Sequence, residues 1–302
     1  MSKSTIPSVA TFVAPPGEKF TLDIAGRALA AAGVTSFRSQ WLDEGAALDM
    51  LFESTEKPSR TLGPRIEAAL HSYPIDVIVQ PLAFRRKALL VADMDSTMIA
   101  QECVDELAET IGQREKVAKL TAAAMRGEVD FHAALTARVA LFEGVPVGAV
   151  QNIVDRITPN PGARALVATM RARGAHAVLV SGGFTLFADL VGARLGFNEV
   201  FANRLEIAQG RLTGRIVPPI QGADAKGEIL TKLCHTRGVS PESTLAVGDG
   251  ANDLVMLSLA GLGVAYRAKP HVAASAACRI ESADLTALLF AQGFTRDSFV
   301  EN

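Results

Sequence analysis

Two aspartates at the end of a strand-like run constrain this chain most. The apolar run 88–92 leads directly into Asp93, and Asp95 follows two residues later. In open α/β sheets, ligands bind at the carboxyl ends of the strands. On a continuing strand the two carboxylates would share one face. Such a pair of hard oxygen groups suits Mg²⁺, and an aspartate can also act as a covalent nucleophile. A D-x-D pair by itself is more typical of a strand-end turn with solvated acids.

A second strand-like run, 178–180, ends in Ser181, Gly182 and Gly183, and an apolar helical pattern follows it. Glycines let backbone amides approach an anion closely, and a helix N-terminus favours negative charge. The pattern therefore indicates an anion-binding segment. An ordinary strand-to-helix turn is the alternative interpretation of these three residues alone.

One lysine lies where a helix would favour an acid. Asp224 is the expected N-cap of a helix, which places Lys226 in its first turn. A cation at this position opposes the helix dipole. Local conflicts of this kind are expected at functional sites, whereas an isolated lysine is usually solvated.

A third strand-like run, 245–247, leads into an acidic glycine loop. In this loop Asp249 and Asp253 can serve as oxygen ligands or as supports of ligands, and Asn252 can form neutral hydrogen bonds. A tight turn with an N-cap would explain this loop on its own. Because the acid pair, the hydroxyl-glycine segment and the acidic loop each follow a strand, together they predict a magnesium and phosphate site.

The same motifs carry a family resemblance. The order D-M-D-S-T, S-G-G, a lysine and G-D-G-A-N-D resembles the haloacid dehalogenase (HAD) superfamily of phosphatases with an aspartate nucleophile. More narrowly, D-M-D-S-T-M-I-A-Q-E-C, the stretch 137–144, V-S-G-G-F and V-G-D-G-A-N-D are similar to the phosphoserine phosphatase family. The resemblance covers residues 88–287 and leaves the first part of the chain unexplained.

The resemblance implies Mg²⁺-dependent hydrolysis of O-phospho-L-serine, the last step of serine biosynthesis, through an aspartyl-phosphate. Asp93 would be the nucleophile. Asp95 would protonate the leaving oxygen and then deprotonate the attacking water, and we expect the neighbouring acid to raise its pKa. The residues implied to hold the metal are Asp93, Asp95 through its backbone carbonyl, Asp249 and, in support, Asp253. Those implied to bind the phosphoryl group are Ser181, Gly182, Lys226 and Asn252.

The resemblance also implies two residues that select the substrate. Glu102 would bind the ammonium group of phosphoserine, and Arg138 would bind its carboxylate with a bidentate fork. Either residue could instead be a solvated helix residue. Other functions remain open: phosphate transfer to homoserine, hydrolysis of another phosphorylated amino acid, or a serine-binding regulatory module with an inactive core.

Two regions are predicted along the chain. In residues 1–84, strands and helices alternate in a β-α-β-β-α-β order, which predicts a ferredoxin-like α+β domain similar to ACT-type modules. Residues 85–302 would form the phosphatase domain, an α/β fold with a mostly parallel, Rossmannoid sheet. A helical insertion at about 102–157 would be its cap, a lid that excludes water from the phosphoenzyme.

Composition limits the partners. With a net charge of −2 in 302 residues, the chain has no excess of positive charge that would indicate binding to nucleic acid or to an anionic membrane. The apolar runs are too short to span a bilayer, and the N-terminus lacks the apolar core of a signal peptide. Three widely spaced cysteines fit reduced thiols in a cytoplasmic protein. The sequence leaves the oligomeric state open, a homodimer included.

Overall fold

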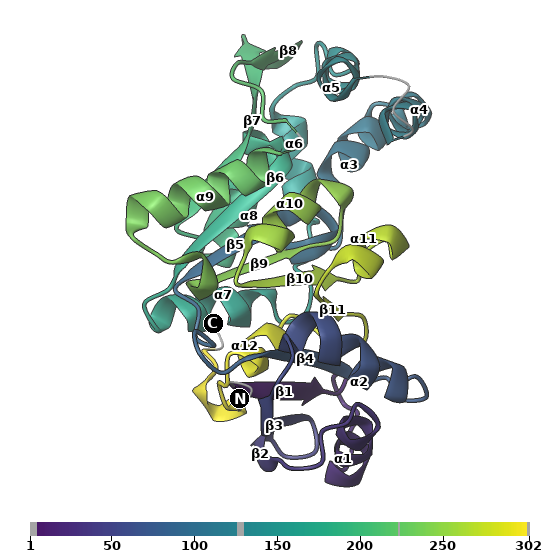
Figure 1. Ribbon diagram of the computed structural model, residues 1–302. Coiled ribbons are helices and arrows are strands. Elements are labelled where there is room, and N and C mark those ends of the chain that lie inside the picture. Colours follow the sequence, from purple (N-terminus) through teal and green to yellow (C-terminus); the bar gives the residue numbers. More distant parts are fainter. Residues whose placement is uncertain (1–4, 126–129, 223, 301–302) are drawn as a thin grey trace.

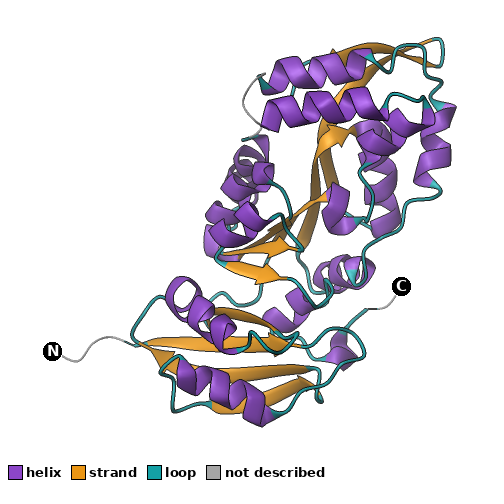
Figure 2. Ribbon diagram, turned by 90° about the vertical axis from the view of Figure 1, so that its right-hand side faces the viewer, coloured by secondary structure: helices purple, strands orange, loops and turns teal. Residues whose placement is uncertain are grey.

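The computed structural model describes residues 5–125, 130–222 and 224–300. Over these residues the strands form two sheets, one of four strands and one of seven (Figure 1). Figure 2 shows the smaller sheet with its helices at one end of the molecule, a layer of helices at the other end, and the larger sheet between them. The expected α/β class is confirmed. Among the described helices, none is long and apolar enough to cross a membrane.

The smaller sheet has the strand order β2-β3-β1-β4, and neighbouring strands are antiparallel. This order is that of a ferredoxin-like sandwich, as the sequence predicts. Phe12 and Leu48 on one face of the sheet pack in a core with Leu29 of the first helix and Ile66 of the second. The elements are β1 (Ile6–Val13), α1 (Leu22–Ala31), β2 (Arg38–Asp43), β3 (Ala47–Ser54), α2 (Gly63–Ala69) and β4 (Asp76–Pro81).

The larger sheet has the order β11-β10-β9-β5-β6-β7-β8 and is parallel except for the β7–β8 hairpin. Its central strand is buried throughout because helices cover both faces. Leu90 and Ala92 contribute to one apolar cluster, and Leu89 and Val91 to the other. The strands are β5 (Leu89–Asp93), β6 (His176–Phe184), β7 (Glu199–Ala208), β8 (Arg211–Val217), β9 (Thr244–Gly248), β10 (Leu262–Tyr266) and β11 (Cys278–Ile280), and the helices are α7 (Ala163–Ala172), α8 (Thr185–Leu195), α9 (Ala225–Arg237), α10 (Leu254–Leu259), α11 (Pro270–Ser275) and α12 (Ala287–Ala291).

A helical insertion separates β5 from α7, as expected from the sequence. Its two connections to the core lie side by side: Ile99 forms a β-bridge with Pro159, and the Ala100 N–H donates to the Thr158 carbonyl at 3.0 Å. In Figure 1 the insertion lies above the end of the larger sheet where β6 and β7 rise toward β8. Within the described residues its helices are α3 (Cys103–Thr110), α4 (Arg114–Met125), α5 (Phe131–Ala140) and α6 (Gly148–Val154).

Two local details differ from the sequence-based expectation. We expected the strand to end before Ser181, but β6 continues through Ser181, Gly182 and Gly183 to Phe184. The short strand β11 was not predicted, because the alternation of apolar and polar residues in Cys278–Ile280 is only three residues long.

Buried polar contacts join the smaller sheet to the C-terminal part of the chain. The guanidinium of Arg85 forms a salt bridge with Asp49 of β3 at 2.6 Å, and it donates to the carbonyl oxygens of Phe290 (3.1 Å) and Ala291 (2.8 Å). The carboxylate of Asp76 in β4 accepts three backbone N–H groups from residues 281–283. The two sheets are therefore held together by specific bonds as well as by apolar packing. The division of the chain at 84/85 into two domains stays a prediction.

Candidate active site

The predicted site residues meet at the carboxyl edge of the larger sheet. Asp93 ends β5, Ser181 lies near the end of β6, and Asp249 directly follows β9. These strands are parallel neighbours, so their carboxyl ends share one edge. A cavity of about 460 Å³ opens at this edge below the cap. It is lined by every predicted site residue except the fully buried Asp253, namely Asp93, Asp95, Glu102, Arg138, Ser181, Gly182, Lys226, Asp249 and Asn252.

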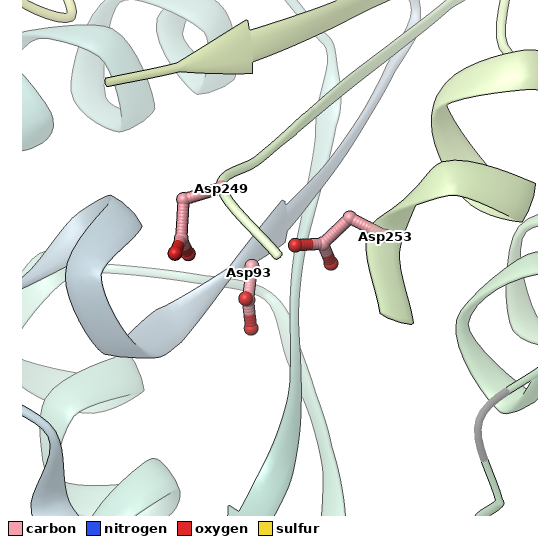
Figure 3. Close-up of side chains that lie close together, drawn as sticks. All are labelled: Asp93, Asp249 and Asp253. Carbon is pink, nitrogen blue, oxygen red and sulfur yellow. The ribbon is translucent and has the colours of Figure 1, made fainter. Parts of the chain in front are cut away.

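Three buried carboxylates form a cluster, of which Asp93 and Asp249 line the cavity and Asp253 lies behind its lining. Carboxylate oxygens of Asp93, Asp249 and Asp253 all lie within 4.8 Å of one another. Figure 3 shows the three side chains converging from the end of β5, from the loop after β9 and from the start of the following helix. Burial and the nearby charge of Asp253 raise the pKa of both Asp93 and Asp249. The cluster is therefore short of positive charge, and a bound cation would relieve that shortage.

Lys226 is the cation of this cluster. It is only 3% exposed, and its Nζ lies 2.6 Å from Asp93 Oδ1 and 2.6 Å from Asp253 Oδ1. Burial alone would lower the pKa of Lys226, but the two carboxylates raise it above its ordinary value. This lysine is therefore a fixed positive charge rather than a solvated surface residue. One lysine beside three carboxylates still leaves the cluster negative, which fits a divalent metal ion.

Asp95 has different surroundings from Asp93. Its Oδ1 accepts the Cys103 N–H at 3.0 Å, where α3 begins. Burial and the charge of Glu102 raise the pKa of Asp95 to about 7. We expected a neighbouring acid to cause the increase, but burial is the larger cause. The acid responsible is Glu102 of the cap rather than Asp93, which is closer in sequence.

The end of β6 forms a narrow wall of the cavity. The Ser181 hydroxyl oxygen accepts the Gly183 N–H at 2.9 Å. A Cβ atom at Gly183 would lie 3.1 Å from this oxygen and 3.5 Å from Asp95 Oδ2, which shows how closely this backbone approaches the acid pair. Asn252 adjoins this segment, since its amide nitrogen is 3.8 Å from the position that a Cβ atom of Gly182 would take. A small anion in this space would meet backbone and side-chain donors from several loops.

The cap contributes Glu102 and Arg138. The Ser96 hydroxyl donates to Glu102 Oε1 at 2.7 Å. The Arg138 side chain is half-buried and donates to Thr121 Oγ1 at 3.3 Å, and burial lowers its pKa. Asp105 lines the same cavity, and its charge partly offsets the effect of burial on the Arg138 pKa. Because Arg138 itself lines the cavity, its guanidinium could contact a ligand carboxylate there.

Sequence reasoning missed residues that support this site. Thr97 is fully buried, and its hydroxyl donates to Asp249 Oδ1 at 3.1 Å. Lys269 lines the cavity, and its backbone N–H donates to the backbone carbonyl of Asp249 at 3.2 Å. Thr97 belongs to the D-M-D-S-T run and could have been considered. The position of Lys269 follows only from the way β10 pairs with β9.

Comparisons with known proteins agree with this geometry. Residues 90–258 match the family of haloacid dehalogenase-like hydrolases. A phosphoserine phosphatase of Archaeoglobus fulgidus is 40% identical over 225 residues, which span 74% of this chain and 65% of that protein. The chain thus spans about two thirds of that relative's length.

Two solved structures are also similar. A HAD family hydrolase from Salmonella enterica serovar Typhi has a TM-score of 0.84 and 29% identity, covering 96% of this chain and 99% of that one. A phosphoserine phosphatase described as a phospho-aspartyl intermediate analogue has a TM-score of 0.63 and 40% identity, covering 68% of this chain and 98% of that one. The chain belongs to the haloacid dehalogenase-like hydrolases, within the family of the phosphoserine phosphatases.

Proposed function

We propose that this protein hydrolyses O-phospho-L-serine to L-serine and phosphate through an aspartyl-phosphate, as the last step of serine biosynthesis. The observation that carries the proposal is one cavity that combines Asp93, Asp95 and Lys226 with the two cap residues Glu102 and Arg138. The first three suit phosphoryl transfer, and the last two suit an amino acid. The relative described as a phospho-aspartyl intermediate analogue supports the covalent step.

Asp93 is the proposed nucleophile. Its carboxylate attacks phosphorus in line with the leaving seryl oxygen, and the oxygen–phosphorus bond of an acyl phosphate forms at Asp93 as the ester bond between the seryl oxygen and phosphorus breaks. Asp95, in its protonated form, donates a proton to the leaving oxygen. The resulting Asp95 carboxylate then takes a proton from the water that hydrolyses the acyl phosphate. A pKa of Asp95 near neutrality suits both proton transfers.

Mg²⁺ is the proposed cofactor. Carboxylate oxygens are the ligands it prefers, and the Asp93, Asp249 and Asp253 cluster lacks positive charge. Asp93, the backbone carbonyl of Asp95 and Asp249 would hold the ion. Asp253 would support the site by fixing Lys226. When bound, the ion would neutralise charge on the phosphoryl oxygens and allow a dianion to approach the acids.

Residues of three loops would bind the phosphoryl group. The Ser181 hydroxyl and the Gly182 N–H would donate to its oxygens, and Lys226 would balance the charge that spreads over them. Asn252, which lines the same cavity beside Gly182, would contact the phosphate of the substrate or of the intermediate. All of these groups except Lys226 are neutral donors, which fits a small, highly charged ligand.

The cap residues would select the amino acid. Glu102 would bind the substrate ammonium group, and Arg138 would bind the carboxylate. Both residues line the same cavity as the acid pair, which suits a substrate with a phosphate at one end and an amino-acid group at the other. We also propose a cytoplasmic location, because Cys103, Cys234 and Cys278 are buried free thiols.

The alternatives differ from this proposal in the acceptor of the phosphate, in the substrate or in the absence of turnover. Transfer to an alcohol such as homoserine would use the same nucleophile, and another phosphorylated amino acid would use the same cap residues. A regulatory protein with an inactive core would bind serine without turnover. The full set of Asp93, Asp95, Lys226 and Asp249 in one cavity favours an active enzyme.

One experiment distinguishes these functions. Phosphate release from L-phosphoserine is measured with Mg²⁺, after exhaustive chelation verified by elemental analysis, and after Mg²⁺ is restored. We expect activity only when Mg²⁺ is present, with L-serine as the organic product. Homoserine is added in parallel, and formation of phosphohomoserine in place of free phosphate would identify a phosphotransferase. Full activity in metal-free buffer would contradict the proposed metal requirement, and absence of turnover under all conditions would contradict the enzymatic function.

A further inference from the structure

A buried asparagine lies directly behind the proposed phosphate-binding segment. Asn203 of β7 is 1% exposed. Its Nδ2 donates to the Gly182 carbonyl at 3.2 Å, and its Oδ1 accepts the Gln221 N–H at 2.7 Å. Both partners are main-chain groups of residues that line the active-site cavity. Because both ends of the amide are bonded, the side chain is fixed in one orientation.

The peptide between Gly182 and Gly183 is held at both of its polar atoms. Its oxygen accepts from Asn203, and its N–H donates to the Ser181 hydroxyl oxygen at 2.9 Å. Two adjacent glycines have the widest backbone freedom, so a bond from outside the segment is needed to keep this peptide in one orientation. Asn203 provides such a bond from the neighbouring strand.

The orientation of this peptide matters for Ser181. A serine hydroxyl has one proton to donate and lone pairs to accept with. Here the Gly183 N–H occupies a lone pair of the Ser181 oxygen, which leaves the proton free for another acceptor. Ser181 is 1% exposed and lines the cavity, so the acceptor within reach of its proton would be a ligand in that cavity.

We propose that Asn203 is a positioning residue for phosphate binding: it fixes the Gly182–Gly183 peptide, and this peptide orients the Ser181 hydroxyl toward the phosphoryl oxygens. The inference rests on the proposed function, in which Ser181 binds the phosphoryl group. Through Gln221, the same side chain also ties this segment to the chain that leads into α9 and Lys226. Asn203 thus joins two sides of the phosphate site without touching the substrate.

The test uses the full-length, Mg²⁺-loaded protein and inorganic phosphate as the probe. Phosphate affinity is measured by isothermal titration calorimetry for wild type, Asn203→Ala and Asn203→Leu. Asn203→Leu keeps a branched side chain and adds no charge, but it removes the donor to Gly182, so it tests the inference if the alanine variant folds poorly. We expect both variants to bind phosphate about tenfold more weakly, because a misoriented Ser181 hydroxyl would lose its hydrogen bond to the anion.

Asn198→Ala is the matched control. Asn198 also bonds the β6 backbone, accepting the Ala177 N–H at 2.9 Å, but at the end of the strand remote from the site. We expect its phosphate affinity to stay within about twofold of wild type. Equal weakening by Asn198→Ala and Asn203→Ala would indicate a general effect on β6 and would overturn the inference.

A double-mutant cycle tests whether Asn203 acts through Ser181. In a Ser181→Ala background, Asn203→Ala should weaken phosphate binding by less than about twofold, because the hydroxyl that it orients is gone. If Asn203→Ala weakens phosphate binding by the same factor with and without the Ser181 hydroxyl, the two residues act independently and the inference is overturned. If the cycle behaves as expected but phosphoserine is not hydrolysed, the proposed function fails while the role of Asn203 in phosphate binding stands.

Discussion

Among single residues, the two aspartates of the D-x-D pair have different partners and therefore different expected roles. Asp93 Oδ1 contacts the Lys226 ammonium at 2.6 Å, whereas Asp95 accepts a backbone N–H and lies near Glu102. A carboxylate held beside a permanent cation is suited to nucleophilic attack. A carboxyl group near an acid, with a pKa of about 7, is suited to proton transfer.

The first residue-level prediction is that Asp93→Asn reduces phosphate release below detection, because an amide oxygen cannot replace the nucleophilic carboxylate. The fold should persist, and the midpoint of thermal unfolding should not fall, since the substitution removes a buried charge that Asp253 disfavours. Phosphate release and thermal unfolding are measured on the same preparation. Turnover close to that of wild type would rule out Asp93 as the nucleophile.

The second residue-level prediction concerns pH. In the free enzyme the acid form of Asp95 protonates the leaving oxygen, so kcat/KM for phosphoserine should fall as pH rises through about 7. An aryl phosphate such as p-nitrophenyl phosphate has a leaving group that needs no proton, so its kcat/KM should fall much less over the same range. The two pH profiles are compared for wild type. Parallel profiles for the two substrates would mean that Asp95 does not act as the acid.

At the level of elements, the cap supplies selectivity while the sheet edge supplies the chemistry. If Arg138 of α5 binds the substrate carboxylate, Arg138→Ala leaves that carboxylate without its partner. The loss is about 1.5–3 kcal/mol, or roughly ten- to a hundredfold in kcat/KM for phosphoserine. Phosphoethanolamine has no carboxylate, so its kcat/KM should fall much less.

The control is Arg114→Ala, which alters an exposed arginine of α4 paired with Glu109 and should leave kcat/KM for both substrates unchanged. An equal loss for both substrates in Arg138→Ala would instead indicate a structural role.

At the level of the whole molecule, the largely buried side chain of Arg85 joins the smaller sheet to α12. It forms an ion pair with Asp49 of β3 and donates to the carbonyl of Ala291 in α12. The Asp49 side chain is 3% exposed, and Arg85 is its salt-bridge partner. Removing one member of a buried pair strands the other charge, so Arg85→Ala should lower the free energy of unfolding by about 3–5 kcal/mol. Denaturant unfolding measures this change. Arg27→Ala, which removes an exposed arginine of α1 paired with Asp23, should change it by less than about 1 kcal/mol. If Arg85→Ala lowers the free energy of unfolding by no more than the control does, the ion pair is not needed to hold the two sheets together.

Much of the fold and of the site could be predicted from the sequence, for a physical reason. Strand and helix periodicities are local properties, so the order of elements was readable, including the ferredoxin-like arrangement of the first region. Parallel strands bring their carboxyl ends to one edge. Asp93, Ser181 and Asp249 could therefore be assigned to one site before any contact was known. The roles assigned to these residues stay predictions that the experiments above address.

The tertiary structure decided the contacts between segments that are distant in sequence. The partners of Lys226, the hydrogen bond from Thr97 to Asp249 and the bond from Asn203 to Gly182 all depend on how neighbouring strands and loops pack. The same is true of the pKa of Asp95, which depends on burial and on Glu102 rather than on its nearest acid in the chain. Periodicity along the sequence specifies which face of an element is apolar, whereas hydrogen bonding and desolvation depend on which atoms meet in the folded core.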